Sequence, residues 1–160
     1  MSHIVLLSCT KSKLDKPSKA KDLYSPSPTF QKTLEYGKSL KPDKMYILSA
    51  KYHLVPLDKT LSPYDLTLKD MKKDDKEEWG KKVISQMKSS GMNLDKDKFT
   101  FLTGTEYMKP ITKYIPDSNI EVPLKGKRMG ERMKWLNDKI KNIKEIYKTI
   151  KNIIYETLQK

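Results

Sequence analysis

Residues 3–13 read His3-Ile4-Val5-Leu6-Leu7-Ser8-Cys9-Thr10-Lys11-Ser12-Lys13, an apolar run that changes abruptly into small, nucleophilic and basic residues. The apolar part shows no alternation with polar residues, which is typical of a strand buried on both faces of a sheet. The polar part cannot continue such a strand, so we interpret it as the loop that leaves its carboxyl end. In open α/β sheets, ligands bind at that end of the strands.

The same pattern returns twice along the chain. Residues 45–48 are apolar and run into Ser49 to His53, and residues 99–102 run into Thr103 to Tyr107. Helices are expected between these strands, over residues 30–40 and 77–90, and right-handed crossovers then make the strands parallel. The sequence therefore predicts an α/β fold, a three-layer domain with a central, mainly parallel sheet.

The segments between these elements have less regular patterns. Thr29 is the expected N-cap of the first helix, and Pro110 is expected in the first turn of a short helix before a fourth strand. The expected ranges are a surface loop over 14–28, an irregular segment over 54–68, solvated charges over 69–76, the short helix over 108–115, the fourth strand over 120–122 and a glycine-punctuated loop over 123–130.

A long helix is expected from residue 131 nearly to residue 160. Its apolar residues alternate at spacings of four and three, the pattern of a heptad seam: Leu136, Ile140, Ile143, Tyr147, Ile150 and Ile154. The first half is expected to pack on the sheet through Met133, Trp135 and Leu136. The second half either projects and forms a homodimer with another chain or folds back as an ordinary amphipathic helix. We divide the chain into an α/β domain over 1–137 and a helical extension over 138–160.

The composition limits the class of protein. A length of 160 residues suits one compact domain, and the single cysteine excludes an intramolecular disulfide. No apolar run is long enough to span a membrane, and no secretory signal is recognised, so a cytoplasmic location is expected. The net charge of +13 indicates either a partner that carries phosphate or merely abundant lysine, because the only arginines are Arg128 and Arg132.

Parallel strands would bring the three polar clusters to one edge of the sheet and form a single cleft there. Lys11 and Lys13 would hold a phosphate or a base carbonyl, and Tyr24 or Tyr64 would stack on a base. Cys9 suits a nucleophile or, more commonly, a packed small residue. The full set of candidate ligand-binding residues is Ser8, Cys9, Lys11, Lys13, Tyr24, Ser49, Lys51, Tyr64, Gly104, Tyr107, Gly126, Arg128 and Arg132.

Two residues are candidates for catalysis. Asp65 lies in a proline-stiffened loop, where it would activate a water or stabilise a developing sugar cation, or else cap a turn. His53 would act as a general acid or base. One cysteine and two histidines do not form a zinc site, and no nucleotide-cofactor fingerprint is present, so neither a metal nor a cofactor is expected.

The motifs resemble a family of small bacterial, phage and archaeal proteins that is classed as a domain of unknown function. The resemblance covers roughly residues 4–137 and rests on Ser8-Cys9 with Lys11 and Lys13, Leu23-Tyr24 with Phe30, residues 47–54, Pro63-Tyr64-Asp65, and Pro123-Leu124 with Gly126, Gly130, Trp135 and Leu136. That family is distantly similar to the Cys-x-Lys domain of archaeosine synthase and related tRNA-modifying proteins, to peroxide-stress proteins and to the uracil-DNA-glycosylase-like fold. The resemblance implies a base or nucleotide ligand, free or within tRNA or DNA.

Three functions are consistent with these observations. The first is an enzyme that acts on a nucleobase or nucleotide and cleaves or exchanges an N-glycosidic bond. The second is a non-catalytic nucleic-acid-binding protein, associated with phage or defence, that uses its basic surface. The third is a dimeric nucleotide sensor in which the last helix reports on the cleft.

Overall fold

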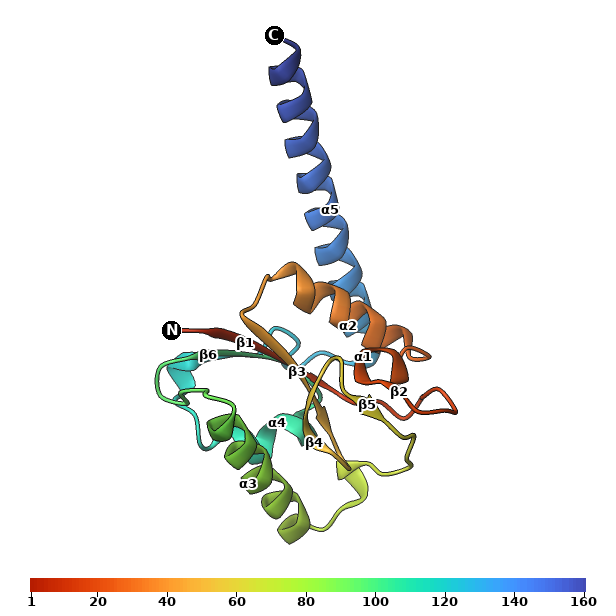
Figure 1. The fold of residues 1–160 in the computed structure, drawn as a ribbon, viewed down its shortest axis with the longest axis vertical. Coiled ribbons are helices and arrows are strands. Elements are labelled where there is room, and N and C mark those ends of the chain that lie inside the picture. Colours follow the sequence, from red (N-terminus) through yellow and green to blue (C-terminus); the bar gives the residue numbers. More distant parts are fainter.

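The structure, a computed structural model, describes residues 1–160 and is built on a five-stranded sheet of order β4-β3-β1-β6-β7 (Figure 1). Four strands are parallel: β1 (His3–Ser8), β3 (Lys44–Ser49), β6 (Lys98–Leu102) and β7 (Ile120–Glu121). Strand β4 (His53–Pro56) is antiparallel to β3 at one edge. The predicted fold class, a three-layer α/β domain with a mainly parallel sheet, is confirmed.

Helices cover both faces of the sheet (Figure 1). Helices α2 (Pro28–Ser39) and α5 (Met129–Gln159) lie together on one face, while α3 (Lys73–Ser89) and α4 (Thr105–Thr112) lie together on the other. The chain runs from β1 to β3 in one direction and returns past β1 to β6 in the other. Because both crossovers are right-handed, this reversal places α2 and α3 on opposite faces.

The core is centred on β1, whose residues Ile4 to Leu7 have no exposed surface. Two glycines let the helices approach closely. A Cβ atom on Gly37 in α2 would lie 2.8 Å from the Met45 methyl carbon, and one on Gly80 in α3 would lie 2.7 Å from the backbone oxygen of Pro110 in α4. Gly80 is therefore required for the close packing of α3 on α4, because the atom that a side chain there would meet belongs to the backbone, although glycine weakens a helix when considered in isolation.

The expectation of plain loops over residues 14–28 and 54–68 was wrong in part. These segments contain β2 (Ser18–Lys19) and β5 (Thr60–Leu61), which pair with each other, and the short helix α1 (Ala20–Leu23). A 3-10 turn, η1 (Leu68–Asp70), follows. Strands of two residues show no periodicity, so sequence reasoning had no pattern from which to find them.

Three predicted helix boundaries were also wrong. Ser27, not Thr29, caps α2, since its hydroxyl accepts a hydrogen bond from the backbone N–H of Phe30. Helix α3 begins at Lys73, inside the segment expected to be only solvated charge. Helix α4 begins at Thr105, so Pro110 lies in its interior, and a second 3-10 turn, η2 (Asp117–Asn119), precedes β7.

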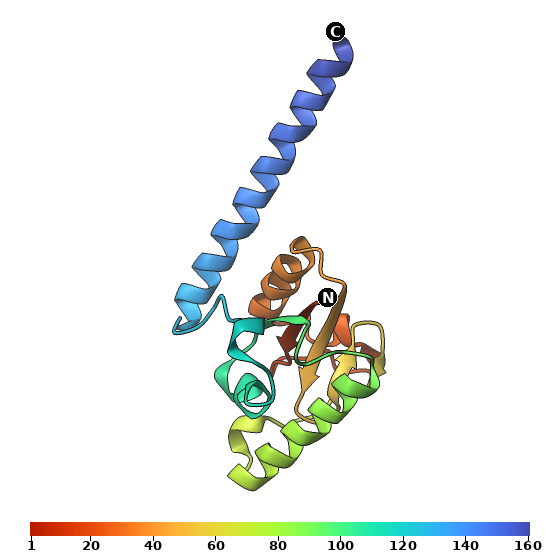
Figure 2. The same ribbon diagram turned by 90° about the vertical axis from the view of Figure 1, so that its left-hand side faces the viewer.

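Helix α5 packs on α2 and then leaves the domain (Figures 1 and 2). The ring centroids of Trp135 and Tyr36 are 5.0 Å apart in an edge-to-face contact, and Leu136 and Ile140 are buried. The expected partner, the sheet, is thus largely replaced by α2. Lys144 still forms an ion pair with Glu35 of α2 at 3.2 Å. Beyond it every residue is exposed and the helix projects away from the domain (Figure 2), which excludes the alternative in which it folds back. None of the helices has the length and apolar character needed to cross a bilayer.

Candidate functional site

The three polar clusters meet at the carboxyl edge of the sheet. The backbone N–H of Cys9 donates to the Leu48 oxygen at 3.0 Å, so the chain leaving β1 lies beside the end of β3. On the other side, Leu7 pairs with Leu102 at the end of β6. The neighbours of β1 are reached in opposite directions, which makes this edge the switch point where doubly wound folds bind ligands.

A chain of three hydroxyl groups lies at this edge. The Tyr24 and Tyr64 oxygens are 2.7 Å apart, and the Tyr64 oxygen is 2.8 Å from Ser49 Oγ. The backbone N–H of Tyr52 donates to Ser49 Oγ at 3.0 Å. The β3–β4 turn therefore holds the serine, and the serine holds the two phenols, one from the end of α1 and one from the loop before η1.

Lys13 lies over this chain. Its Nζ atom is 4.4 Å from the centre of the Tyr64 ring and 5.9 Å from that of Tyr24, and it donates to the Lys11 backbone oxygen at 3.2 Å. Partial burial lowers the pKa of Lys13, while the nearby Cys9 and the Asp65 carboxylate act to raise it. A partly buried lysine of this kind is characteristic of amines that bind or react with a ligand.

Cys9 and Tyr107 form the adjoining part of the site. The Cys9 thiol, which is buried, donates to the Tyr107 hydroxyl at 3.3 Å, and the Leu68 N–H donates to the same oxygen at 3.4 Å. Burial raises the pKa of Tyr107, and the nearby cysteine raises it further. We call the six residues that meet here the edge cluster: Cys9, Lys13, Tyr24, Ser49, Tyr64 and Tyr107.

Burial also raises the pKa of Tyr64, and it raises the pKa of Tyr24 from 10.0 to about 12. Above pH 10 the unfolded chain loses the Tyr24 proton while the folded protein retains it, so stability is complete below pH 10 and falls as the pH approaches 12. For Tyr24 alone the loss corresponds to about 3 kcal/mol of unfolding free energy. Urea unfolding of the wild type and of Tyr24→Phe between pH 10 and about pH 12 measures this loss of unfolding free energy. The variant should lose less stability over this range, and an identical fall in both proteins would contradict the assignment.

The expectation that Tyr24 stacks on a base is not compatible with its burial. Tyr24 has no exposed surface, and its ring packs on Phe30 with centroids 5.3 Å apart. Tyr64 is partly exposed, although Tyr52 contacts it edge to face and Lys13 lies over its ring. Tyr24 is thus a support for Tyr64, because their hydroxyl groups are joined.

The two candidate catalytic residues lie in different surroundings. Asp65 is exposed and close enough to Lys13 for its charge to act on the pKa of that amine. His53 has a left-handed φ of 65° after the three-residue turn that joins β3 to β4, a conformation such turns require. Its ring is stacked on Trp79 at 6.4 Å, and burial lowers its pKa. No side-chain hydrogen bond joins His53 to the edge cluster.

The other predicted ligand contacts do not belong to the edge cluster. Ser8 ends β1 and is partly buried, whereas Lys11 and Lys51 are exposed. Gly104 is the N-cap of α4. Near the start of α5, Gly126 has a φ of +74°, Arg128 is the N-cap, and Arg132 donates through Nε to the Lys127 oxygen at 2.9 Å.

Sequence reasoning missed three residues at this edge. Trp79 donates its indole N–H to the Ser49 oxygen at 2.9 Å and contacts Tyr107 edge to face, although its helical spacing indicated only an apolar face. Tyr52 contacts Tyr64 and donates its hydroxyl to the Ser62 oxygen. Thr103 is buried directly after β6, and its position in the third polar cluster was the only signal that pointed to it.

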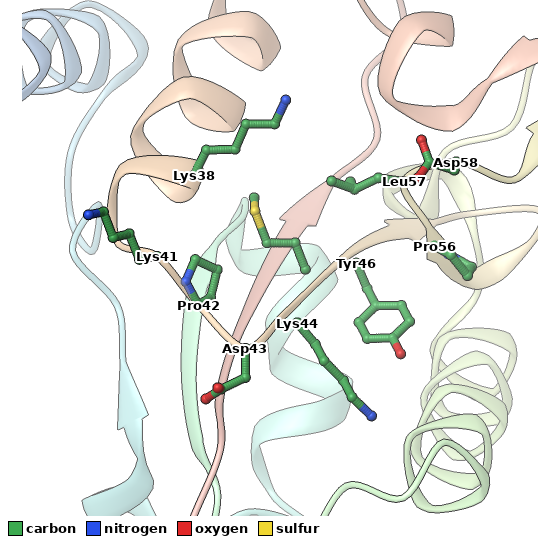
Figure 3. A pocket seen from close by; sticks show the side chains of 10 residues that line it. Lys38, Lys41, Pro42, Asp43, Lys44, Tyr46, Pro56, Leu57 and Asp58 are labelled. Atoms are coloured by element: carbon green, nitrogen blue, oxygen red, sulfur yellow. The ribbon is translucent and has the colours of Figure 1, made fainter.

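A hollow of about 550 Å³ lies at the opposite edge of the sheet, at the start of β3 (Figure 3). None of the predicted site residues lines it. Figure 3 shows that Lys38, Lys41 and Lys44 point in different directions, and Lys44 Nζ donates to the Ser90 oxygen at 3.1 Å. These amines do not converge on a common point, so the carboxyl edge remains the candidate site.

Comparison with known proteins gives one assignment. No curated protein and no solved structure matches the chain significantly. The model of a family of unknown function, DUF6884, matches residues 4–138, which include the whole edge cluster and the entry to α5. The chain therefore belongs to the DUF6884 family.

Proposed function

We propose that this protein is an enzyme that handles a nucleobase or nucleotide and cleaves or exchanges its N-glycosidic bond. The observation that carries the proposal is Lys13, a partly buried amine that lies over Tyr64 with an exposed carboxylate, Asp65, near it. These groups meet at the switch point of the sheet, where ligands of doubly wound folds bind. The strand order resembles that of doubly wound folds, so the expected position of the ligand rests on an analogy between folds.

The chemistry assigns a role to each group. Cleavage breaks the bond between the sugar C1′ and the base nitrogen, and the electron pair leaves with the base. Lys13 donates a hydrogen bond to the base and stabilises that negative charge. Asp65 stabilises the cationic sugar and takes a proton from the water that adds to C1′. One water is consumed, its hydroxyl ending on the sugar and a proton on the base.

The buried groups position these two residues. Tyr24 and Ser49 fix the Tyr64 hydroxyl, and Tyr64 presents the ring on which Lys13 lies. The Cys9 thiol is held by Tyr107 and is too enclosed for a nucleophile in this conformation, so we assign it to packing. Lys11 and Lys51, which are exposed, supply positive charge for phosphate groups beside the edge cluster.

The test is release of free base, followed by chromatography, from nucleoside 5′-monophosphates and from short DNA and RNA. Lys13→Met should lower the rate at least about 100-fold, because it removes a charge that acts on the leaving base. Lys16→Met is the matched control, since Lys16 is exposed in the same loop, and it should keep the wild-type rate. Equal rates for Lys13→Met and the wild type would exclude the assigned role.

A second candidate function is non-catalytic binding of nucleic acid. The favouring observation is the projecting part of α5, which carries exposed lysines such as Lys148 and Lys151 on a chain of net charge +13. This function predicts an affinity for DNA or RNA that falls steeply with salt. It also predicts that substitutions of Asp65 and His53 have no effect, which separates it from the first function.

The projecting part of α5 is also proposed to pair with a second copy of the chain. Large apolar side chains remain more than half exposed along one stripe: Ile146, Tyr147, Ile150, Ile153, Ile154 and Leu158. They continue the heptad seam that begins with the buried Leu136 and Ile140. A short isolated helix rich in isoleucine is marginal in water, so a packing partner for this stripe is needed.

A further inference from the structure

The heptad seam of α5 has two halves with different surroundings. In the half near the domain, Leu136 and Ile140 are buried where α5 packs on α2. In the distant half, Ile150 and Ile154 are more than half exposed. A heptad seam stays on nearly one side of a helix, because it drifts by only about 20° per heptad. The exposed half therefore faces the same side of α5 as the half that α2 covers.

This arrangement blocks a parallel pair of α5 helices. The axes of two packed helices lie about 8–10 Å apart, and one helix with its side chains is itself about 10 Å wide. In a parallel pair the covered halves of both α5 helices would stand at the same height, with the α2 of each copy on the side that faces the other. Two α2 helices do not fit between axes so close together, and a staggered parallel pair is head-to-tail and does not close on itself.

An antiparallel pair avoids the overlap with α2. Only the exposed halves of the two α5 helices meet, and the two domains lie at opposite ends of the pair. In Figures 1 and 2 the distant half of α5 rises above every other element of the chain. Every residue from 145 onward is exposed, so the side on which a second helix would pack is open.

The exposed stripe is also complementary to its own reverse. Ile146, Ile150, Ile154 and Leu158 follow one another at equal spacings of four, so this row reads the same from either end. Reversal about position 152 places Ile150 opposite Ile154 of the second copy and Ile146 opposite Leu158 of the second copy. Each apolar side chain of the row then faces another apolar side chain, which makes a second copy of this chain a fitting partner.

We propose that two copies of the chain pair through antiparallel α5 helices over residues 146–158, with the two-fold axis at position 152. The proposal rests on the pairing proposed above and adds its direction. The overlap spans about 20 Å, and the two Ile143 residues lie about 27 Å apart along the pair. The two edge clusters are then well separated, and each is complete within one chain.

The direction of pairing also decides where the lysines of α5 lie. Lys148 and Lys151 are on one flank of the apolar stripe, and Glu156 is on the other. The two-fold axis of an antiparallel pair is perpendicular to the helices, so the same flank of both helices is on the same face. Lysines from both copies therefore form one basic face, the surface that the second candidate function would use.

Disulfide cross-linking between variants with one added cysteine tests the direction. Positions 147 and 157 are equally far from position 152, so Tyr147→Cys and Thr157→Cys bring cysteines to the same height only in the antiparallel pair. An equal mixture of the two variants should form linked dimers with oxidised glutathione. Either variant alone should form at least about tenfold fewer, because its two added cysteines lie about 15 Å apart along the pair, beyond the reach of a disulfide.

Two controls accompany the cross-linking. The wild type should not link, because its only cysteine, Cys9, is buried. Thr149→Cys mixed with Thr157→Cys should not link either, since Thr149 is exposed but lies outside the apolar stripe.

A distance measurement leaves the apolar stripe intact. Spin labels on Asn137→Cys, an exposed position, should be at least about 45 Å apart in the antiparallel pair, whereas a parallel pair holds them at the same height. Labels that are close together, or Tyr147→Cys that links efficiently to itself, would overturn the antiparallel direction and leave the pairing. A wild type that sediments as a monomer would overturn both.

Discussion

Asp65→Asn is expected to abolish base release while leaving nucleotide affinity within about tenfold of the wild type. Asp65 is exposed, and its negative charge reaches the Lys13 amine in the edge cluster. Asparagine keeps the size of the side chain but neither stabilises a sugar cation nor takes a proton from water. The loss should therefore appear in turnover, measured by chromatography of the free base, and not in binding, measured by calorimetry.

Asp70→Asn provides the control for this experiment. Asp70 is exposed in η1, five positions further along the chain, and its carboxylate makes no hydrogen bond or ion pair. It should retain full turnover, which would separate the position of Asp65 from the general loss of a negative charge. Unchanged turnover in Asp65→Asn would exclude the catalytic role of this carboxylate.

The double substitution Ile150→Lys with Ile154→Lys is expected to convert a dimer into a monomer. Both side chains are more than half exposed in the single chain and lie on the heptad seam of α5. Burial of one isoleucine side chain contributes about 1.5–3 kcal/mol, so two lysines in each chain remove several such contributions and add repulsion between copies. Sedimentation velocity measures the change, and the domain, which these side chains do not contact, should keep its Tm.

Asn152→Lys is the matched variant for the helix. Asn152 is exposed and lies outside the seam, so the lysine adds positive charge to α5, one charge against the two of the double substitution, without entering the interface. It should remain a dimer. A monomeric wild type, or a dimer that survives the double substitution, would contradict pairing through this helix.

The parallel part of the fold was predictable because each long strand shows its own pattern. Ile4 to Leu7 are apolar without interruption and are buried on both faces as that pattern requires. The two-residue strands β2 and β5 were not found, since their formation depends on partners distant in the chain. The cap at Ser27 is a local contact, but Thr29, two positions later, has a side chain equally suited to capping. Whether the second half of α5 projects or folds back was likewise undecided, because a heptad seam is consistent with either arrangement.

The location of the candidate site could be predicted from the sequence better than its side-chain contacts could. The position of Cys9, Ser49 and Tyr107 at strand ends followed from parallel topology. The burial of Tyr24 did not, because it depends on α1, which the sequence did not reveal. Trp79 was assigned to packing alone, since helical spacing identifies a buried face but not a hydrogen bond to the Ser49 oxygen.

The sequence by itself determined the alternation of strands and helices, the polar residues at the ends of β1, β3 and β6, and the heptad seam of α5. Local patterns suffice for these features, because they follow from the periods of helices and strands. Only the tertiary structure decided that Lys13 lies partly buried over Tyr64, that Thr103 has a buried and unpaired hydroxyl, and that α5 projects. Each of these depends on groups far apart in sequence, whose burial is fixed only when the layers pack.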